Sequence, residues 1–196
     1  MGVDTRQFIG YALTGGQNML NIRAATKADL DSLRAVGCET YQAHFSTLWS
    51  PAGMQDFLEQ DFSRDSLSRS LDRPARHSWL IASDNEGAPL GFAKVNWSTP
   101  APITGELGAE LQKIYFLKSA AGLGYGRQLL QFICDQAVQR AEHLLWLDVL
   151  KSNSNAQRFY AGFGFRRIGE ITFSTELAEI GMLVMGLELN QHQKEK

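Results

Sequence analysis

The sequence has few cysteines, no long apolar run and no excess of one charge. Its 196 residues include two cysteines, Cys38 and Cys134, which lie far apart in segments with helical patterning. Such cysteines argue against a disulfide framework and against a cysteine metal site, and they favour buried thiols in a reducing compartment. We therefore expect a cytoplasmic protein without a bound metal.

The missing apolar run and the balanced charge exclude further classes. A membrane span needs roughly 18 to 20 consecutive apolar residues, and no stretch of this chain approaches that length. A formal net charge of -2 provides no basic excess for a phosphate backbone. We therefore expect neither a membrane nor a nucleic acid as a partner.

The composition that remains is that of an ordinary globular domain, with 44% hydrophobic and 20% charged residues. A chain of this length buries a sizeable core as one domain, which we place at residues 19–190. Residues 1–18 lack the apolar core and cleavage site of a signal peptide, so we expect a flexible leader, with Met19 as an alternative start. We expect a polar tail over residues 191–196, and either a monomer or a homodimer.

Hydrophobic patterning alternates between the helical and the strand period along the chain. The first expected helix has Thr26 as its N-cap and Asp29 three residues later. Pro51 is expected to break the next helical region, residues 38–71, into two helices. Further helices are expected over residues 126–141 and 153–162, with a loop over 98–108. The expected strands cover residues 20–24, 78–83, 89–97, 110–117, 144–150, 165–173 and 182–189. This order predicts an α/β or α+β layered fold with a mixed sheet.

The stretch SAAGLGYGRQLLQF joins an expected strand to an expected helix and carries glycines at positions 122, 124 and 126. Alternating glycines let successive N–H groups turn inward, and the following helix adds the positive end of its dipole, so the loop suits a phosphate. Plain chain reversal is the alternative interpretation. A P-loop requires Gly-Lys-Ser/Thr, but Gly126 precedes Arg127. The glycine spacing also differs from the dinucleotide fingerprint, although Asp148 lies 22 residues after Gly126.

A second motif, NSNAQRFYAGFGF, begins at Asn153. As a structural element it is a short helix with Asn153 as its N-cap and with Gly162 or Gly164 at its end. Tyr160 lies in this helix and has two interpretations. It is either an ordinary residue of an amphipathic helix or a phenol that supplies a proton.

Together the two motifs resemble the GNAT family of N-acetyltransferases. The family's cofactor signature, Gln/Arg-x-x-Gly-x-Gly/Ala, falls on AGLGYG at residues 121–126, and its later pattern, Asn-x-x-Ala-x-x-Φ-Tyr-x-x-x-Gly-Phe, is met in full by residues 153–165. The segments ELQKIYFL, IGEITF and ETYQAHF are similar to bacterial polyamine (spermidine/spermine) N-acetyltransferases. The resemblance implies a GNAT fold, with a central twisted, mixed and mostly antiparallel sheet of six to seven strands and helices on both faces.

The resemblance implies acetyl-CoA as the cosubstrate, and no metal. The pyrophosphate is expected on the glycine loop and the pantetheine arm along the end of the preceding strand. The residues expected to bind the cofactor are Phe116, Leu117, Lys118, Ala121, Gly122, Leu123, Gly124, Tyr125, Gly126, Arg127, Asn153 and Tyr160. Ala121 departs from the family's Gln or Arg, so we expect weaker cofactor affinity with the fold retained. Lys118 or Arg127 are candidates for the missing side-chain charge.

Acetyl transfer to an amine requires a base and an acid. A phenol with an ordinary pKa of about 10 stays protonated at neutral pH, and the resemblance implies that Tyr160 protonates the departing thiolate of coenzyme A. Glu110 lies 11 residues before Ala121, where some family members carry a glutamate base, and it is our candidate base. Since many members have no single base, the alternative is a carboxylate that merely attracts a cationic acceptor.

Other ionisable residues have no firm assignment. We expect His44 and His77 to be surface residues. Asp148 is alone in the apolar stretch LLWLDVL and needs a partner or a position in a cleft. Acidic residues in segments expected to line the acceptor side favour a cation such as a polyamine; they are Glu39, Glu59, Asp61 and Glu110.

These observations predict an acetyl-CoA-dependent N-acetyltransferase that acts on a primary amine, with a polyamine as an example of a small acceptor. Two alternatives are a coenzyme A-binding sensor or scaffold without turnover, and an enzyme that acetylates a protein or peptide. A pure binder has no need of an acid at Tyr160, which argues against the first alternative.

Overall fold

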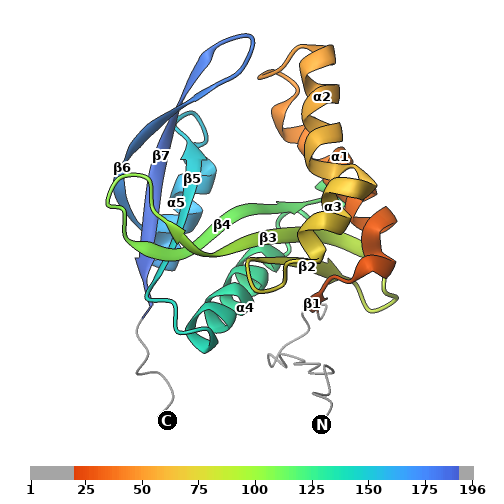
Figure 1. Cartoon of the computed structure of the whole chain (residues 1–196), viewed down its shortest axis with the longest axis horizontal. Coiled ribbons are helices and arrows are strands. Elements are labelled where there is room, and N and C mark those ends of the chain that lie inside the picture. The colour runs from red at the N-terminus through yellow and green to blue at the C-terminus, as the bar shows by residue number, and fades with distance from the viewer. Residues whose placement is uncertain (1–19, 190–196) are drawn as a thin grey trace.

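The computed structural model describes residues 20–189. The predicted leader, the alternative start at Met19 and the predicted tail lie outside the described residues. The strands, labelled in Figure 1, are β1 (Asn21–Ala24), β2 (His77–Ser83), β3 (Pro89–Pro100), β4 (Leu107–Phe116), β5 (Leu144–Leu150), β6 (Arg166–Ser174) and β7 (Glu179–Glu188). The α-helices are α1 (Leu30–Phe45), α2 (Pro51–Phe62), α3 (Arg64–Leu71), α4 (Tyr125–Gln139) and α5 (Ser154–Phe163). Short 3-10 turns, η1 (Lys27–Asp29) and η2 (Lys118–Ala120), precede α1 and the glycine loop.

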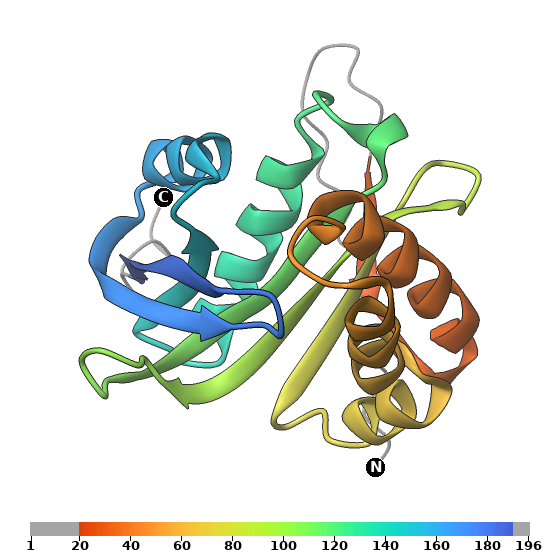
Figure 2. The same cartoon turned by 90° about the horizontal axis from the view of Figure 1, so that it is seen from above.

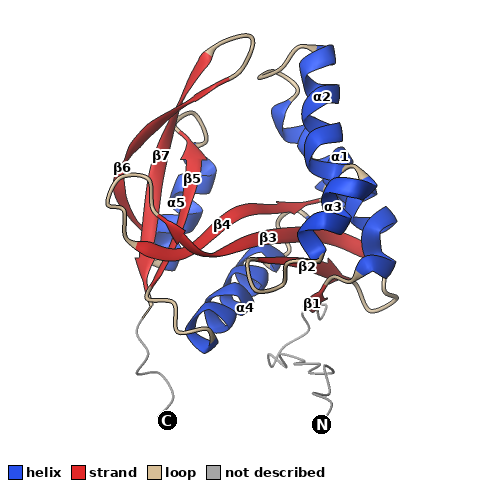
Figure 3. Ribbon diagram, in the orientation of Figure 1, coloured by secondary structure: helices blue, strands red, loops and turns tan. Residues whose placement is uncertain are grey.

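One sheet of seven strands in the order β1-β2-β3-β4-β5-β7-β6 forms the centre of the fold. Its neighbouring strands are antiparallel except β4 and β5, which are parallel. The predicted mixed, mostly antiparallel sheet is therefore confirmed. The parallel register joins Ala109 to Leu145 and Glu110 to Trp146 and extends no further. Beyond these pairs β4 and β5 diverge, so that β5, β6 and β7 stand upright beside β1 to β4 in Figures 1 and 3.

The core forms two layers, one on each face of the sheet, because side chains alternate along a strand. Leu80 and Leu145 belong to the layer under α4 and α5. Trp79 and Phe92 belong to the layer under α1, α2 and α3. Figure 2 shows helices on both sides of the sheet, as predicted. Within residues 20–189, no helix has the length and hydropathy that crossing a membrane requires.

The helical region before β2 differs from the prediction. Pro51 begins α2 instead of breaking a helix, because the first helical position tolerates a residue without an N–H. The Ser50 hydroxyl caps this helix by accepting from Gly53 N at 3.0 Å. A further break falls at Ser63, whose hydroxyl caps α3. The region therefore contains the end of α1 and two more helices. The Thr26 cap with Asp29 at N3 is confirmed.

The predicted loop over residues 98–108 is also shorter than expected. Strand β3 continues to Pro100 and β4 begins at Leu107. A register shift between Asn96 and Thr99 makes this possible, and it places Ser98 at a φ of 48°. The buried carboxylate of Glu142, just beyond α4, accepts from Ser98 N at 2.8 Å and thereby satisfies the irregular backbone.

Candidate active site

The glycine loop presents a row of free backbone donors. Gly122 and Gly124 both have a φ of 77°, a conformation that side chains disfavour. Gly124 is the N-cap of α4 and supplies no side-chain cap. Among the described residues, no acceptor receives a hydrogen bond from the N–H groups of residues 122–126. These donors, together with the N-terminus of a 15-residue helix, form a site for an anion.

The other predicted cofactor residues of this segment lie around that loop. Phe116 is half-buried and packs near the Tyr125 ring, with ring centroids 6.3 Å apart. Leu117 N donates to Leu90 O at 2.8 Å, which anchors the strand end. Lys118, Ala121, Leu123 and Arg127 are exposed. The Arg127 guanidinium lies 5.2 Å from the centre of the Phe163 ring.

Helix α5 brings the second motif to the point where β4 and β5 separate. Asn153 is its N-cap and accepts from Ala156 N through Oδ1 at 3.0 Å. Tyr160 is 8% exposed and packs against Phe159 and Phe165. The Tyr160 hydroxyl has no hydrogen-bond partner within the described part of the chain. Every fully buried polar side-chain atom in that part has a hydrogen-bond partner, so the Tyr160 hydroxyl is not fully buried and reaches solvent. Burial, and then the charge of Asp148, raise the pKa of Tyr160 well above its ordinary value. The phenol therefore stays protonated at neutral pH.

Asp148 lies between the acid and the base that the sequence predicted. It is two residues beyond Trp146, the register partner of Glu110, so Asp148 and Glu110 share one face of the sheet. Desolvation by its surroundings and then the charge of Glu110 raise the pKa of Asp148, and Lys113 opposes this. The Asp148 side chain is nevertheless exposed, so the groups that desolvate it leave it open to solvent.

Glu110 is part of a hydrogen-bonded row across three strands. Asn96 Nδ2 donates to Glu110 Oε2 at 2.7 Å, and Asn96 Oδ1 lies 2.8 Å from His77 Nδ1. His77 is therefore not the free surface histidine that was expected. His44 is exposed, and its ring centroid lies 5.8 Å from that of Tyr115.

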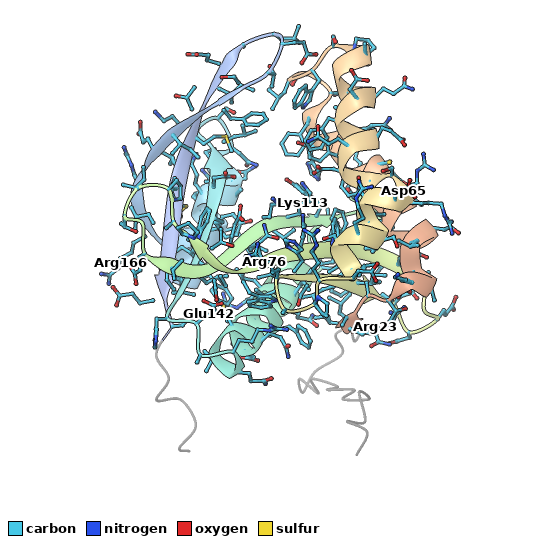
Figure 4. The ribbon with its side chains drawn as sticks, in the orientation of Figure 1. Arg23, Asp65, Arg76, Lys113, Glu142 and Arg166 are labelled. Carbon is cyan, nitrogen blue, oxygen red and sulfur yellow. The ribbon has the colours of Figure 1, made fainter. Side chains whose placement is uncertain are left out.

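A buried lysine adjoins this row on β4, visible near the centre of Figure 4. Lys113 is 7% exposed, and its ammonium lies 2.6 Å from Asp61 on α2. The same ammonium lies 5.4 Å from the Phe57 ring and 5.8 Å from the Tyr41 and Phe62 rings. Aromatic faces and one carboxylate thus hold a cation that the water-poor interior would otherwise disfavour.

Of the remaining acidic residues predicted for the acceptor side, Asp61 lies beside this row through its ion pair with Lys113, whereas Glu39 and Glu59 do not gather there. Glu39 is exposed on α1. Glu59 is exposed on α2 and lies 3.6 Å from Arg34 in an ion pair. Asp61 is neutralised by Lys113. The carboxylates that the fold does bring together are Glu110 and Asp148.

The β6–β7 loop closes over the outer end of this face. Ser50 N, at the start of α2, donates to Glu176 Oε1 at 2.7 Å. The Trp49 and Phe173 rings meet edge to face at 6.0 Å. The two sides of the molecule therefore touch above the diverging strands, where the blue hairpin leans toward α2 in Figure 1. An open hollow of about 400 Å³ beside this contact is lined by Trp49, Phe57, Asp56, Gln60 and Glu176.

Comparison with known proteins decides the family. The sequence profile of the acetyltransferase (GNAT) family matches residues 37–165. The chain belongs to this family. This GNAT protein is 30% identical over 155 residues to an uncharacterised N-acetyltransferase of Lactobacillus delbrueckii, a match that covers 79% of this chain and 88% of the relative. It is an N-acetyltransferase by this relationship and by its fold.

Solved structures of the family share the fold at low identity. The PaiA N-acetyltransferase of Thermoplasma acidophilum, in complex with coenzyme A, has a TM-score of 0.67 and 18% identity over 86% of this chain and 98% of its own. A spermidine N-acetyltransferase chimera from Vibrio cholerae has a TM-score of 0.67 and 16% identity over 90% of this chain and 99% of its own. These likenesses support the GNAT fold, and the predicted polyamine subgroup is not confirmed by them.

Asn96 and Lys113 belong to the site but were not predicted from the sequence. The β3 stretch GFAKVNW carries a signal, because Lys94 and Asn96 alternate with apolar residues and so share one face. On β4, Glu110 and Lys113 are three residues apart and would point to opposite faces of a regular strand. A register shift after Lys94 adds one residue to β4, so Lys113 pairs with Lys94 while Glu110 pairs with Asn96. This shift has no visible sequence signal.

Proposed function

We propose that this acetyltransferase transfers the acetyl group of acetyl-CoA to the primary amine of a small molecule. The observation that carries the proposal is the register of β4 and β5, which places Asp148 on the same face as Glu110 where the two strands separate. Burial and, after it, the charge of Asp148 raise the pKa of Tyr160. A base and an acid thus flank one point of the molecule. The glycine loop with its free N–H groups follows directly from β4.

On the donor side, the N–H groups of residues 122–126 bind the pyrophosphate of acetyl-CoA. The pantetheine arm runs beside Phe116, Leu117 and Lys118, where β4 has no pairing partner on the side of β5. Asn153 uses Oδ1 for the α5 cap and keeps its amide N–H groups for the cofactor. Arg127 and Lys118 contribute positive charge in place of the family residue that Ala121 replaces.

The reaction moves two protons and exchanges one bond for another. Glu110 takes a proton from the acceptor ammonium, directly or through water, which frees the amine lone pair. The nitrogen then bonds to the acetyl carbon while the carbon–sulfur bond breaks. Tyr160 donates its proton to the departing thiolate. The nitrogen releases its second proton, which restores the Tyr160 phenol through water, and Glu110 returns its proton to water. Asp148 faces the entering ammonium and holds it by charge.

The acceptor class that the charges support is a small cationic amine such as a polyamine. Glu110 and Asp148 supply negative charge on a face that also carries the Tyr41 and Tyr115 rings, whose phenol pKa values are raised first by burial and, to a smaller extent, by nearby charges that include Asp148. The bond between Glu176 and Ser50 closes the outer end of this face, which favours a small molecule over a protein chain.

The test is release of coenzyme A thiol from acetyl-CoA across a panel of polyamines, amino acids and peptides, with and without Tyr160→Phe. We expect turnover with a polyamine and a loss of at least tenfold in kcat for Tyr160→Phe, with unchanged coenzyme A binding by calorimetry. Binding of coenzyme A with no thiol release for any amine contradicts the transferase and favours the sensor. An unchanged kcat in Tyr160→Phe contradicts the assigned acid.

A further inference from the structure

The row formed by His77, Asn96 and Glu110 follows from strand register. His77 on β2 is paired with Asn96 on β3, and Asn96 is paired with Glu110 on β4. Paired residues point to the same face of a sheet, so the three side chains meet although they are 33 residues apart in sequence. Asn96 is 9% exposed, and the row lies on the face that carries α1, α2 and α3.

The chemistry of the three groups fixes the direction of each hydrogen bond. An ionised carboxylate only accepts, so Asn96 must present its NH₂ group to Glu110. The carbonyl oxygen of Asn96 then faces His77 and accepts from Nδ1–H. A rotation of the amide by 180° would place a carbonyl against the carboxylate and an NH₂ group against an N–H donor. His77 therefore holds the amide in the orientation that serves Glu110.

This bond also decides which oxygen of Glu110 remains available. Asn96 engages Oε2 at 2.7 Å, and no donor among residues 20–189 bonds to Oε1. The charged groups around Glu110 come from four elements. They are Asp148 on β5, Lys113 on β4, Lys94 on β3 and Asp61 on α2. None of them forms an ion pair with Glu110, so the Asn96 amide is the group in direct contact with it.

We propose that Asn96 is a positioning residue that holds the Glu110 carboxylate with Oε1 turned to the acceptor amine, and that His77 holds Asn96 in the required orientation. The inference rests on the proposed function, in which Glu110 is the base. It adds two residues on two other strands that set the geometry of that base without touching the substrate.

The first test is Asn96→Asp, which keeps the shape and places a second carboxylate against Glu110. Two carboxylates in contact share a proton, so the acid limb of the pH profile of kcat/KM is expected to rise by about one unit. On the acid limb we expect roughly a tenfold lower kcat/KM at a given pH, with recovery to the wild-type rate at pH values well above the limb. The matched control is Asn85→Asp, which adds the same charge to the exposed turn of the same hairpin and should leave the profile unchanged.

Carboxyl carbon-13 NMR titration of Glu110 gives a readout that needs no turnover. The titration midpoint of Glu110 is expected to rise in Asn96→Asp and to stay unchanged in Asn85→Asp. Asn96→Ala removes the donor without adding charge and serves as the second variant if Asn96→Asp does not fold. It should lower kcat severalfold and leave the KM for acetyl-CoA unchanged. His77→Phe, which frees the amide to rotate, should do the same to a smaller extent.

An unshifted Glu110 midpoint and an unshifted acid limb in Asn96→Asp overturn the positioning role of Asn96. A kcat in His77→Phe equal to the wild-type value overturns the part assigned to His77. Glu110→Gln separates these failures from failure of the proposed function. If Glu110→Gln retains wild-type activity, the base assignment itself is wrong. If Glu110→Gln is inactive while Asn96→Asp behaves as wild type, the proposed function stands and the positioning role alone is lost.

Discussion

The donor side of the molecule offers backbone groups, whereas the acceptor side offers side chains. On the donor side, the N–H groups of five consecutive residues, 122–126, have no acceptor among the described residues at the start of α4. On the acceptor side, His77, Asn96, Glu110 and Lys113 come from three strands and are held by contacts that cross the sheet. The first arrangement depends on local conformation, and the second depends on register.

This difference predicts how each side responds to change. A backbone site is expected to tolerate side-chain variation but to be sensitive to any residue that alters φ. A side-chain site is sensitive to the loss of a single partner, because a buried charge or amide is then left without its counterpart. Four substitutions test the contrast, from the largest expected effect to the smallest.

The strongest test of the acceptor side is Lys113→Met. It removes the ammonium and leaves Asp61, whose side chain is 27% exposed, beside aromatic rings without its cation. We expect a loss of about 2–4 kcal/mol in the free energy of unfolding, measured with urea. The control is Lys27→Met, in an ion pair with Asp72 where the two side chains are 58% and 56% exposed. A loss in Lys113→Met as small as that of the control would contradict the buried ion pair.

The matching test of the donor side is Gly124→Ala. Alanine disfavours the φ of 77° found at Gly124, so the free N–H groups turn away and coenzyme A affinity is expected to fall roughly tenfold. Calorimetry with coenzyme A measures this. Gly87→Ala is the control, because Gly87 has a φ of 86° in open space within the β2–β3 turn. Equal affinities of the two variants would show that the loop conformation does not govern binding.

The third test concerns the pH dependence of the ion pair that links β1 to the start of α1 on the acceptor side. Arg23 lies 2.6 Å from Asp29 and, with hydrogen bonds from Thr26, lowers the pKa of Asp29 to about 2. Because the folded pKa lies below the unfolded one, this stabilisation is present above about pH 4 and is lost as the pH falls toward 2. Asp29→Asn should cost roughly 1–2 kcal/mol at pH 7, given the partial exposure of Arg23. The cost should shrink below pH 3, and a constant cost across this range would refute the assignment.

The smallest expected effect comes from restoring the family residue on the donor side. Ala121 is exposed at the entrance of the glycine loop, so Ala121→Arg should add a charge-assisted contact to the pyrophosphate. We expect coenzyme A to bind roughly two- to fivefold more tightly, since exposed charge pairs contribute less than about 1 kcal/mol. Gln131→Arg adds the same charge further along the exposed side of α4 and is not expected to change affinity. Equal gains in both variants would point to net charge alone.

The sequence predicted most strands, the glycine loop and the α5 cap because each depends on neighbouring residues. Strand β5 has the predicted bounds, since an apolar run interrupted only by Asp148 and flanked by polar residues leaves little choice. The helix break predicted at Pro51 was wrong because proline suits both a break and a helix start, and the local sequence does not distinguish them. The roles of the predicted site residues remain proposals. The structure adds Asn96, His77 and Lys113 beside them.

By itself, the sequence determined the family and the glycine loop that we propose as an anion site, because glycine spacing, helix caps and the position of Tyr160 are local properties of a short segment. Only the tertiary structure decided which side chains meet Glu110. The extra residue in β4 turns Lys113 to the same face as Glu110, and the pairing of β2, β3 and β4 brings His77 and Asn96 to it. A register shift reverses the face of every residue that follows it, and the sequence carries no local mark of where that shift falls.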